Sequence, residues 1–88
     1  HELNFTRIDA NNFIFDGKTL INDMCRVIGL DIFQLDEIRG SADSIAGLVL
    51  EQTSEMPKKD QELTILQYKF KVLSVTKKRI EKIQITIL

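Results

Sequence analysis

The sequence contains few of the residues that catalyse reactions, bind transition metals or cross-link chains. Its 88 residues include one cysteine, one histidine, one proline and no tryptophan. A single cysteine rules out a disulfide within the chain, which is typical of a reducing cytoplasm. Zinc and similar metals need more cysteine and histidine ligands than this. Cys25 also lacks a histidine to act as its base, because His1 stands at the terminus, so we predict no catalytic residue and no metal site.

Long apolar runs are also missing. No stretch approaches the ~20 residues of a membrane-spanning helix, and the first residues have neither the basic nor the apolar region of a secretory signal. The chain does not begin with methionine, so we expect a fragment of a longer protein, with residues 1–4 as a disordered terminus or a tag remnant. Its length and its apolar content of 43% suit one domain, residues 1–88.

Neither sign of charge dominates, since the net charge is −1, but the two signs are unevenly distributed. Residues 1–57 hold ten acidic and four basic side chains, a net charge of −6. Residues 58–88 hold three acidic and eight basic ones, a net charge of +5. A near-neutral chain has no general attraction for nucleic acid or membranes. The separation instead predicts docking or self-association through oppositely charged faces.

The spacing of apolar residues predicts an α+β fold. Residues 5–8 and 13–15 are expected to be short strands joined by a turn rich in Asn and Asp. Residues 19–28 carry one apolar stripe at helical spacing. Thr19 is the predicted N-cap of this helix, and Gly29 is predicted to lie just past its end.

Residues 43–55 are predicted to form the main helix, with Ser41 or Asp43 as its N-cap. Pro57 is expected to end it, because the residue before a proline is pushed out of the helical region. Gly47 lies on the apolar side, where alanine would favour a helix by about 1 kcal/mol. We therefore expect Gly47 to let this helix approach the sheet closely.

Two strands with alternating apolar residues complete the predicted antiparallel sheet, which packs against the two helices. They cover residues 64–72 and 83–87, and residues 76–79 form the turn between them. A bend at residues 67–68 would split the first of them. The alternation directs four side chains of this strand inward: Leu66, Tyr68, Phe70 and Val72.

The segment between the helices, residues 30–40, is too apolar for a linker, and both a packed loop and a short helical turn fit it.

Asp36 and Glu37 could join Asp43 around Mg²⁺ or Ca²⁺. No calcium-loop spacing is present, however, and a solvated acidic surface is the preferred interpretation. Residues 39–44 could bind phosphate before a helix N-terminus. One glycine and no Lys-Ser/Thr ending favour an ordinary capped loop.

Basic residues gather in the last third of the chain. Lys69 and Lys71 alternate outward on a predicted strand, and together with Lys82 they form the candidate docking face. The neighbouring aromatic residues point the other way and cannot stack bases beside the lysines, so we expect no nucleic-acid binding. Protection of a sheet edge by charge explains these lysines equally well. Docking on an acidic protein surface or on anionic headgroups is a further alternative.

Several segments together resemble the transporter-associated domain at the C-terminus of the CorC/HlyC family of membrane transporters. The likeness covers residues 12–88. Its carriers are Phe13–Gly17, Leu20–Met24, Ser44–Glu51, Pro57, Tyr68–Val72 and Arg79–Ile83. Ser44 stands where threonine is usual in the family, and Gly47 three residues later matches the pattern. Residues 66–67 depart from it, because family members usually have a glycine-rich turn there. Residues 43–47 also resemble members linked to gliding motility.

The resemblance implies a fold and a setting. Family members have a transmembrane domain first, then a pair of CBS domains, then this module in the cytoplasm of a bacterial inner-membrane protein. They are associated with Mg²⁺ and Co²⁺ efflux, and some are labelled hemolysins. The implied fold is a small antiparallel sheet packed against two helices, related to a subdomain of flavin-binding oxidoreductases of the PCMH type. FAD binding is therefore implied by fold relatedness alone.

The resulting prediction is a non-catalytic regulatory or interaction module that is not itself inserted into the membrane. Its expected partners are the CBS and transmembrane domains of its own full-length chain, or a second copy in a homodimer. No cofactor is expected, because the sequence has no glycine-rich pyrophosphate loop and so small a domain cannot enclose a dinucleotide. The alternative is a module that senses FAD or an adenine nucleotide.

Overall fold

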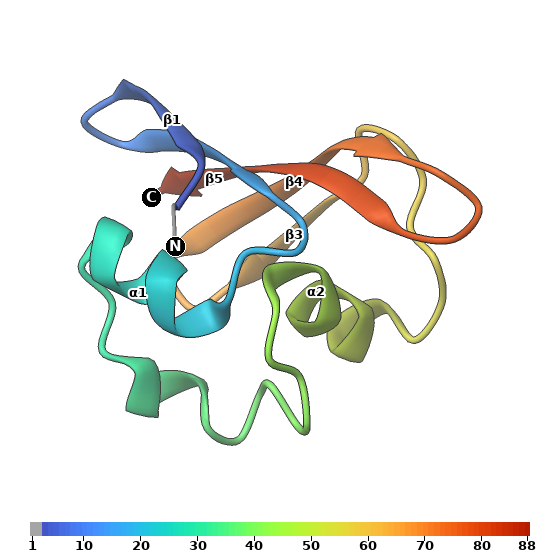
Figure 1. The fold of residues 1–88 in the computed structure, drawn as a ribbon. Coiled ribbons are helices and arrows are strands. Elements are labelled where there is room, and N and C mark those ends of the chain that lie inside the picture. Colours follow the sequence, from blue (N-terminus) through green and yellow to red (C-terminus); the bar gives the residue numbers. More distant parts are fainter. Residues whose placement is uncertain (1–2) are drawn as a thin grey trace.

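A computed structural model describes residues 3–88 as a five-stranded antiparallel sheet with helices on one face (Figure 1). The strands are β1 (Phe5–Asp9), β2 (Asn12–Asp16), β3 (Glu62–Ile65), β4 (Tyr68–Val75) and β5 (Ile80–Ile87). Their order is β1-β2-β5-β4-β3, so β5 lies at the centre. The segment between β2 and β3 forms helix α1 (Ile21–Ile28), the short 3₁₀ helix η1 (Ile32–Leu35) and helix α2 (Ile45–Thr53). The predicted α+β class, antiparallel sheet and two helices are confirmed.

Of the first four residues, the structure describes Leu3 and Asn4. The expectation for His1 and Glu2 lies outside the described residues. Leu3 and Asn4 line a surface hollow beside β1 and β2. The expectation of a disordered terminus or a tag remnant stays a prediction.

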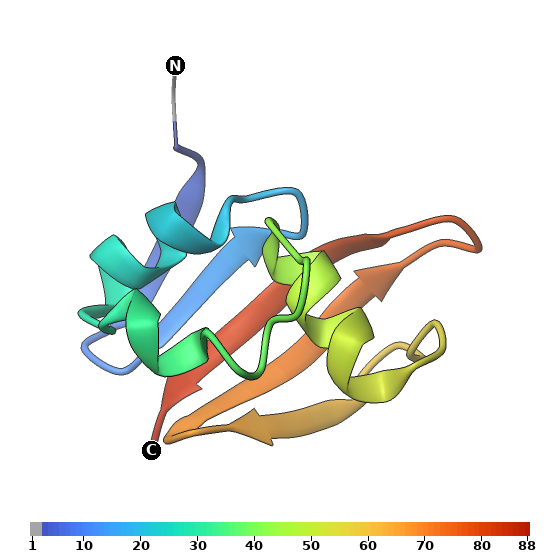
Figure 2. The same ribbon diagram turned by 90° about the horizontal axis from the view of Figure 1, so that it is seen from below.

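The hydrophobic core lies between the sheet and the helical layer (Figure 2). The strand register places Phe15 and Val72 on either side of Ile83, and it places Phe13 and Phe70 on either side of Ile85. The helices cover these residues with side chains that are completely buried: Ile21, Met24, Ile45, Leu48 and Val49. Each such side chain contributes about 1.5–3 kcal/mol through its burial, so this layer is the main source of stability.

Backbone hydrogen bonds between two loops fix the starts of both helices. The N–H of Ile21 donates to the carbonyl of Asp43 at 2.8 Å, and the N–H of Ile45 donates to the carbonyl of Thr19 at 2.9 Å. Leu20 occupies the N-cap position of α1 without a side-chain cap. The prediction of Thr19 as N-cap is therefore wrong, because a distant backbone segment supplies the hydrogen bonds. Gly29, with φ of 76°, does lie just past the end as predicted.

Helix α2 is capped by the residue directly before it. The Ser44 hydroxyl accepts a hydrogen bond from the N–H of Gly47 at 3.0 Å. The predicted caps, Ser41 and Asp43, are therefore wrong by one to three positions, and Asp43 uses its backbone carbonyl for α1 instead.

Two residues with positive φ lie where a helix and a strand end earlier than the sequence pattern predicted. Ser54, with φ of 64°, ends α2 before Pro57 is reached, so the predicted role of Pro57 is wrong. Leu66, with φ of 56°, forms with Gln67 a tight turn between β3 and β4. This turn confirms that a bend splits the long strand, and it lies one residue before the predicted position at residues 67–68. It also leaves Leu66 43% exposed, so its predicted inward direction is wrong.

The helical segments are short. Residues 30–40 contain η1, which confirms a short helical turn, one of the two forms that the sequence allowed. The carboxylate of Asp31 begins it by accepting from the N–H of Phe33 at 3.0 Å. Across residues 3–88 there is no helix with the length and apolar character that crossing a membrane requires.

Gly17 lies where the backbone of the turn after β2 closely approaches both β5 and α2. A Cβ atom there would collide with the carbonyl oxygen of Ile80 in β5 and would lie 3.3 Å from the Cβ of Ala46 in α2. Gly17 donates its N–H to the carbonyl of Glu81 and accepts from the N–H of Ala46, both at 2.9 Å. The end of β2 is thus fixed to β5 on one side and to α2 on the other.

Gly47 does not play the predicted part. A Cβ at this position would meet Ala42 at 3.1 Å and the hydroxyl of Ser44 at 3.3 Å, and both belong to the segment just before α2. The predicted contact between Gly47 and the sheet is therefore wrong. The sequence pattern identified a glycine on the apolar side of the helix, but it could not tell which neighbour that glycine would face.

We expect Gly17→Ala to lower the free energy of unfolding by about 1–3 kcal/mol, the usual cost of adding atoms to a filled site. Gly47→Ala is the matched control. It should change stability by less than about 1 kcal/mol, because better helix propensity offsets the close contact with Ala42. Urea unfolding followed by circular dichroism measures both. A Gly17→Ala variant as stable as the unmodified chain would contradict the close approach described above.

Candidate functional site

The face of the sheet that points away from the helices is uncovered (Figure 1). Alternate residues of each strand point to it, because their neighbours in the sequence face the core. We call this surface the open face. Its members are Thr6, Asn12, Ile14, Asp16, Glu62, Thr64, Lys69, Lys71, Lys82, Gln84 and Thr86. Charged and neutral polar groups thus form one continuous mixed surface.

The three lysines of the candidate docking face all lie on the open face. Lys69 and Lys71 come from β4, and Lys82 comes from β5. Lys82 forms an ion pair with Asp16 of β2, and the Lys69 ammonium lies 4.0 Å from Glu62 of β3. Lys71 has no ion pair among the residues that the structure describes. The face is therefore less basic than its lysines alone indicate, because nearby carboxylates neutralise two of them.

A small hydrogen-bonded group organises the centre of the open face. The side-chain oxygen of Asn12 accepts from the hydroxyl of Thr86 at 2.6 Å and from the amide of Gln84 at 3.3 Å. Sequence reasoning missed this group, because it assigned Asn12 to a turn and not to a strand. The alternation of Gln84 and Thr86 with isoleucines was the available signal, and it predicted their direction but not their partner.

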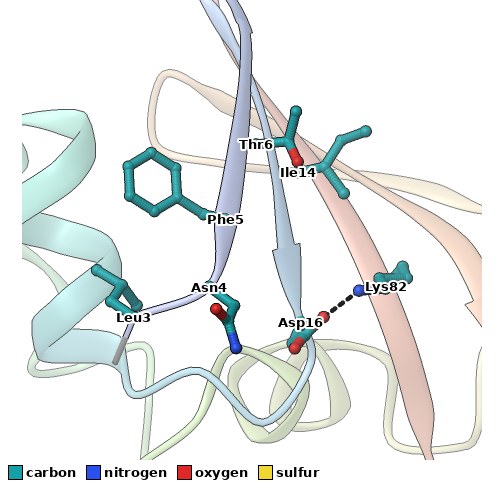
Figure 3. Close-up of a pocket in the computed structure, with 7 residues that line it drawn as sticks. All are labelled: Leu3, Asn4, Phe5, Thr6, Ile14, Asp16 and Lys82. Carbon is teal, nitrogen blue, oxygen red and sulfur yellow. Dashed lines mark hydrogen bonds and ion pairs between the residues drawn. The ribbon is translucent and has the colours of Figure 1, made fainter. Parts of the chain in front are cut away.

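A hollow of about 290 Å³ opens beside the open face, where β1 meets β2 (Figure 3). Asn4, Thr6, Ile14 and the ion pair between Asp16 and Lys82 line it, together with Leu3 and Phe5. These groups can hold a partner by hydrogen bonds and charge.

Cys25 belongs to the core. It is 4% exposed on α1, and burial raises the pKa of its thiol above the ordinary value. Both features keep the sulfur in its unreactive protonated form at neutral pH. The prediction that Cys25 fills the core is confirmed.

The first N–H groups of α2, which would face a phosphate bound at the candidate turn before this helix, already have partners. The N–H groups of Ile45, Ala46 and Gly47 donate to the carbonyl of Thr19, the carbonyl of Gly17 and the hydroxyl of Ser44. An anion at this helix N-terminus would have to replace those bonds. The interpretation as a capped loop is therefore the one that the structure supports.

The acidic residues Asp36, Glu37 and Asp43 do not converge. Within residues 3–88, no three histidine, cysteine or carboxylate side chains are grouped so that they could hold a metal ion. Asp43 instead uses its backbone to join the two helix starts.

Comparison with known proteins places the chain in a family. The family model of the CorC/HlyC transporter-associated domain matches residues 6–88, and the chain belongs to this family. Over 78 residues the chain is 30% identical to the polyamine export protein of Escherichia coli K12. The match covers 89% of this chain but only 17% of that protein, so the chain spans about a sixth of its relative.

Solved structures share the fold. The transporter-associated domain of a CBS domain protein from Porphyromonas gingivalis matches with a TM-score of 0.84 at 27% identity. That match covers 93% of this chain and 94% of the other. A Neisseria meningitidis region associated with a Mg²⁺ and Co²⁺ transporter, CorC, has a TM-score of 0.83 at 20% identity. It covers 97% of this chain and 99% of that one, and at this identity the likeness concerns the fold alone.

We expect the Cys25 thiol to react slowly with an aromatic disulfide reagent at neutral pH, because the sulfur is buried and protonated. After unfolding in urea the same thiol should react rapidly, and this reaction serves as the internal control. The absorbance of the released thiolate measures both rates. Full modification of the folded chain at the rate of the unfolded one would show that Cys25 is accessible.

Proposed function

We propose that this chain is a non-catalytic interaction domain of a cation-exporting membrane protein, positioned in the cytoplasm and acting through its open face. The observation that carries the proposal is the uncovered sheet face, with its hydrogen-bonded centre and mixed charges. Its partners would be the CBS and transmembrane domains of the full-length chain, or a second copy. Regulation would follow from contact, because docking and release of this domain would favour different states of the transporter.

Two relatives support the choice of cations as the transported class. The Escherichia coli relative is named a polyamine export protein, and the Neisseria meningitidis region is associated with a Mg²⁺ and Co²⁺ transporter. Polyamines and divalent metal ions share positive charge. We propose that the parent protein exports Mg²⁺ and Co²⁺. A transport assay that found polyamine export instead would replace this proposal. Transport itself would belong to the parts of the parent protein outside this chain.

The size of the open face suits docking. Five strands spaced about 4.8 Å apart make a surface roughly 20 Å wide, and strands of four to eight residues, at about 3.4 Å per residue, give it a similar length. The outline of this surface, on the order of 400 Å², is smaller than the roughly 600–800 Å² that a specific interface buries on each partner, so it suits a small, reversible contact. Paired charges at a rim contribute orientation and association rate more than affinity. A contact of moderate strength that can be reversed is therefore the expected kind.

We expect Lys69→Gln with Lys71→Gln to weaken association with the rest of the full-length protein. Lys71 lies opposite Glu62 in the strand register, and Lys69 is the ion-pair partner of Glu62. The double variant therefore removes both positive charges beside this carboxylate. Exposed pairs contribute about 0.2–1 kcal/mol each, so affinity should fall roughly 2- to 30-fold, and less at high salt. The measurement is calorimetric titration of this domain into the parent protein truncated before it.

The matched control is Lys58→Gln with Lys59→Gln, which changes the net charge equally at exposed positions in the loop before β3. This variant should bind like the unmodified domain. Equal binding by both double variants at every salt concentration would show that the open face is only solvated surface.

We further propose that the domain takes no flavin or adenine nucleotide. The support is the occupied N-terminus of α2 and the lack of a glycine-rich phosphate loop in the sequence. Titration with FAD and with ATP should leave flavin fluorescence and heat release unchanged from buffer. Saturable binding at micromolar concentration would contradict this proposal and would favour the ligand-sensing alternative.

A further inference from the structure

The turn between β4 and β5 presents three consecutive cations. Lys77, Lys78 and Arg79 are all exposed, and none of them forms an ion pair within residues 3–88. We call these three residues the basic tip. The tip contrasts with the open face, where Lys69 and Lys82 already lie beside carboxylates. Its charge is therefore available to an external partner.

The backbone of the basic tip is held in place by Thr76. The N–H of Thr76 donates to the carbonyl of Arg79 at 2.8 Å, which closes the turn. The Thr76 hydroxyl accepts from the N–H groups of Lys78 and Arg79 at 3.2 Å and 3.1 Å. The turn thus has a fixed backbone, whereas its long side chains make no hydrogen bond or ion pair within residues 3–88 and stay adaptable.

More positive charge gathers at the base of the tip. Lys18 and Arg79 line one hollow of about 240 Å³, together with Asp16, Ile80, Glu81 and Lys82. The close approach of Gly17 to β5 brings Lys18 there. Of the two acids, Asp16 is already paired with Lys82. The loop of residues 58–61, which bonds to β4 through Asp60 and Val72, lies at the same end and adds two lysines and one aspartate.

The basic tip projects from the molecule. In both views the β4–β5 hairpin, coloured orange to red, extends beyond the helical layer (Figures 1 and 2). A flat surface could therefore contact the tip without meeting α1 or η1. A projecting cluster of free cations is complementary to a surface of dense negative charge.

The composition of the tip distinguishes between two such surfaces. Specific protein interfaces usually contain a buried aromatic or aliphatic anchor. The large apolar residues that the described chain exposes are Phe5, Ile8, Leu20, Phe33, Leu66 and Leu88, and none of them lies in the turn. Contact with lipid headgroups needs no such anchor, because it depends on the number of charges near the surface. The family of transporter-associated domains also places a membrane within reach.

We propose that the basic tip binds anionic phospholipid headgroups, which would orient the domain against the membrane of its own transporter. This inference rests on the proposed function only for the nearness of a membrane. The contact would be electrostatic and superficial, with no apolar insertion. Each basic side chain near an anionic surface should raise affinity about fivefold.

The test uses this domain alone, because the Porphyromonas gingivalis and Neisseria meningitidis relatives were solved as separate domains of the same extent. The domain is sedimented with vesicles of phosphatidylglycerol and phosphatidylcholine in equal amounts, and with vesicles of phosphatidylcholine alone. Lys77→Gln with Lys78→Gln should lose about 25-fold in partitioning to the anionic vesicles. Lys69→Gln with Lys71→Gln, the matched control with the same charge change, should keep most of it. Circular dichroism verifies that each variant is folded.

We expect the unmodified domain to bind anionic vesicles and not vesicles of phosphatidylcholine alone. This binding should be lost in the Lys77→Gln with Lys78→Gln variant and at high salt. Equal loss in both double variants would overturn the proposal, since net charge alone would then explain it. No binding to anionic vesicles would overturn it too. Self-association that depends on the tip, without vesicle binding, would point to an acidic protein surface instead. The outcomes are separable from the docking proposal, because the open-face variant tests that one in a binding assay without lipid.

Discussion

The junction at Gly17 is the constraint on which the rest of the structure depends. At this point β2 ends, its backbone bonds to β5, and the first turn of α2 bonds back to it. Directly after it, residues 19–21 and 43–45 exchange backbone hydrogen bonds, and Leu20 forms a bridge with Ser44. One short segment therefore fixes the sheet and both helix starts. A side chain at Gly17 would separate these parts, since the site has no space for a Cβ.

This junction also explains why only one face of the sheet is covered. Both helices lie in the single connection between β2 and β3, and both begin beside the same strand end. They are thereby directed to the same side. The remaining strands connect by tight turns, so within residues 3–88 no helix or long loop lies between them to cover the second face. The uncovered face is a consequence of connectivity. Its polar residues satisfy part of their hydrogen bonding among themselves, as Asn12 does with Thr86.

Periodicity predicted the elements well, because alternation and helical spacing reflect which side of each element is buried. The β4 residues Tyr68, Phe70 and Val72 and their partners on β5 face the core as expected. The element ends were less predictable. Thr19 was a reasonable cap by residue type, but the carbonyl that completes the helix start comes from Asp43, far along the sequence. Such long-range backbone bonds leave no local signature.

The same distinction applies to the surface. Sequence alternation predicted that Lys69 and Lys71 point outward, but not that Glu62 lies across from Lys71 and near Lys69. The separation of charge along the chain also overstated the separation in space, because Asp16 from the acidic part pairs with Lys82 from the basic part. Pairing across strands depends on register, which a single sequence does not specify residue by residue.

The edges of the sheet are poor candidates for self-association. Strand β1 has a register shift between Arg7 and Asp9, and β3 is four residues long and begins with Glu62. Irregular, short and charged edges disfavour the pairing of strands between molecules. A partner is therefore more readily received on the open face or at the basic tip.

These two surfaces differ in kind. The open face has fixed hydrogen bonds and paired charges, which favour one orientation of one partner. The tip has free cations, which respond to charge density and give little discrimination. A domain with both could be held near a membrane by the tip and still select its contact through the face.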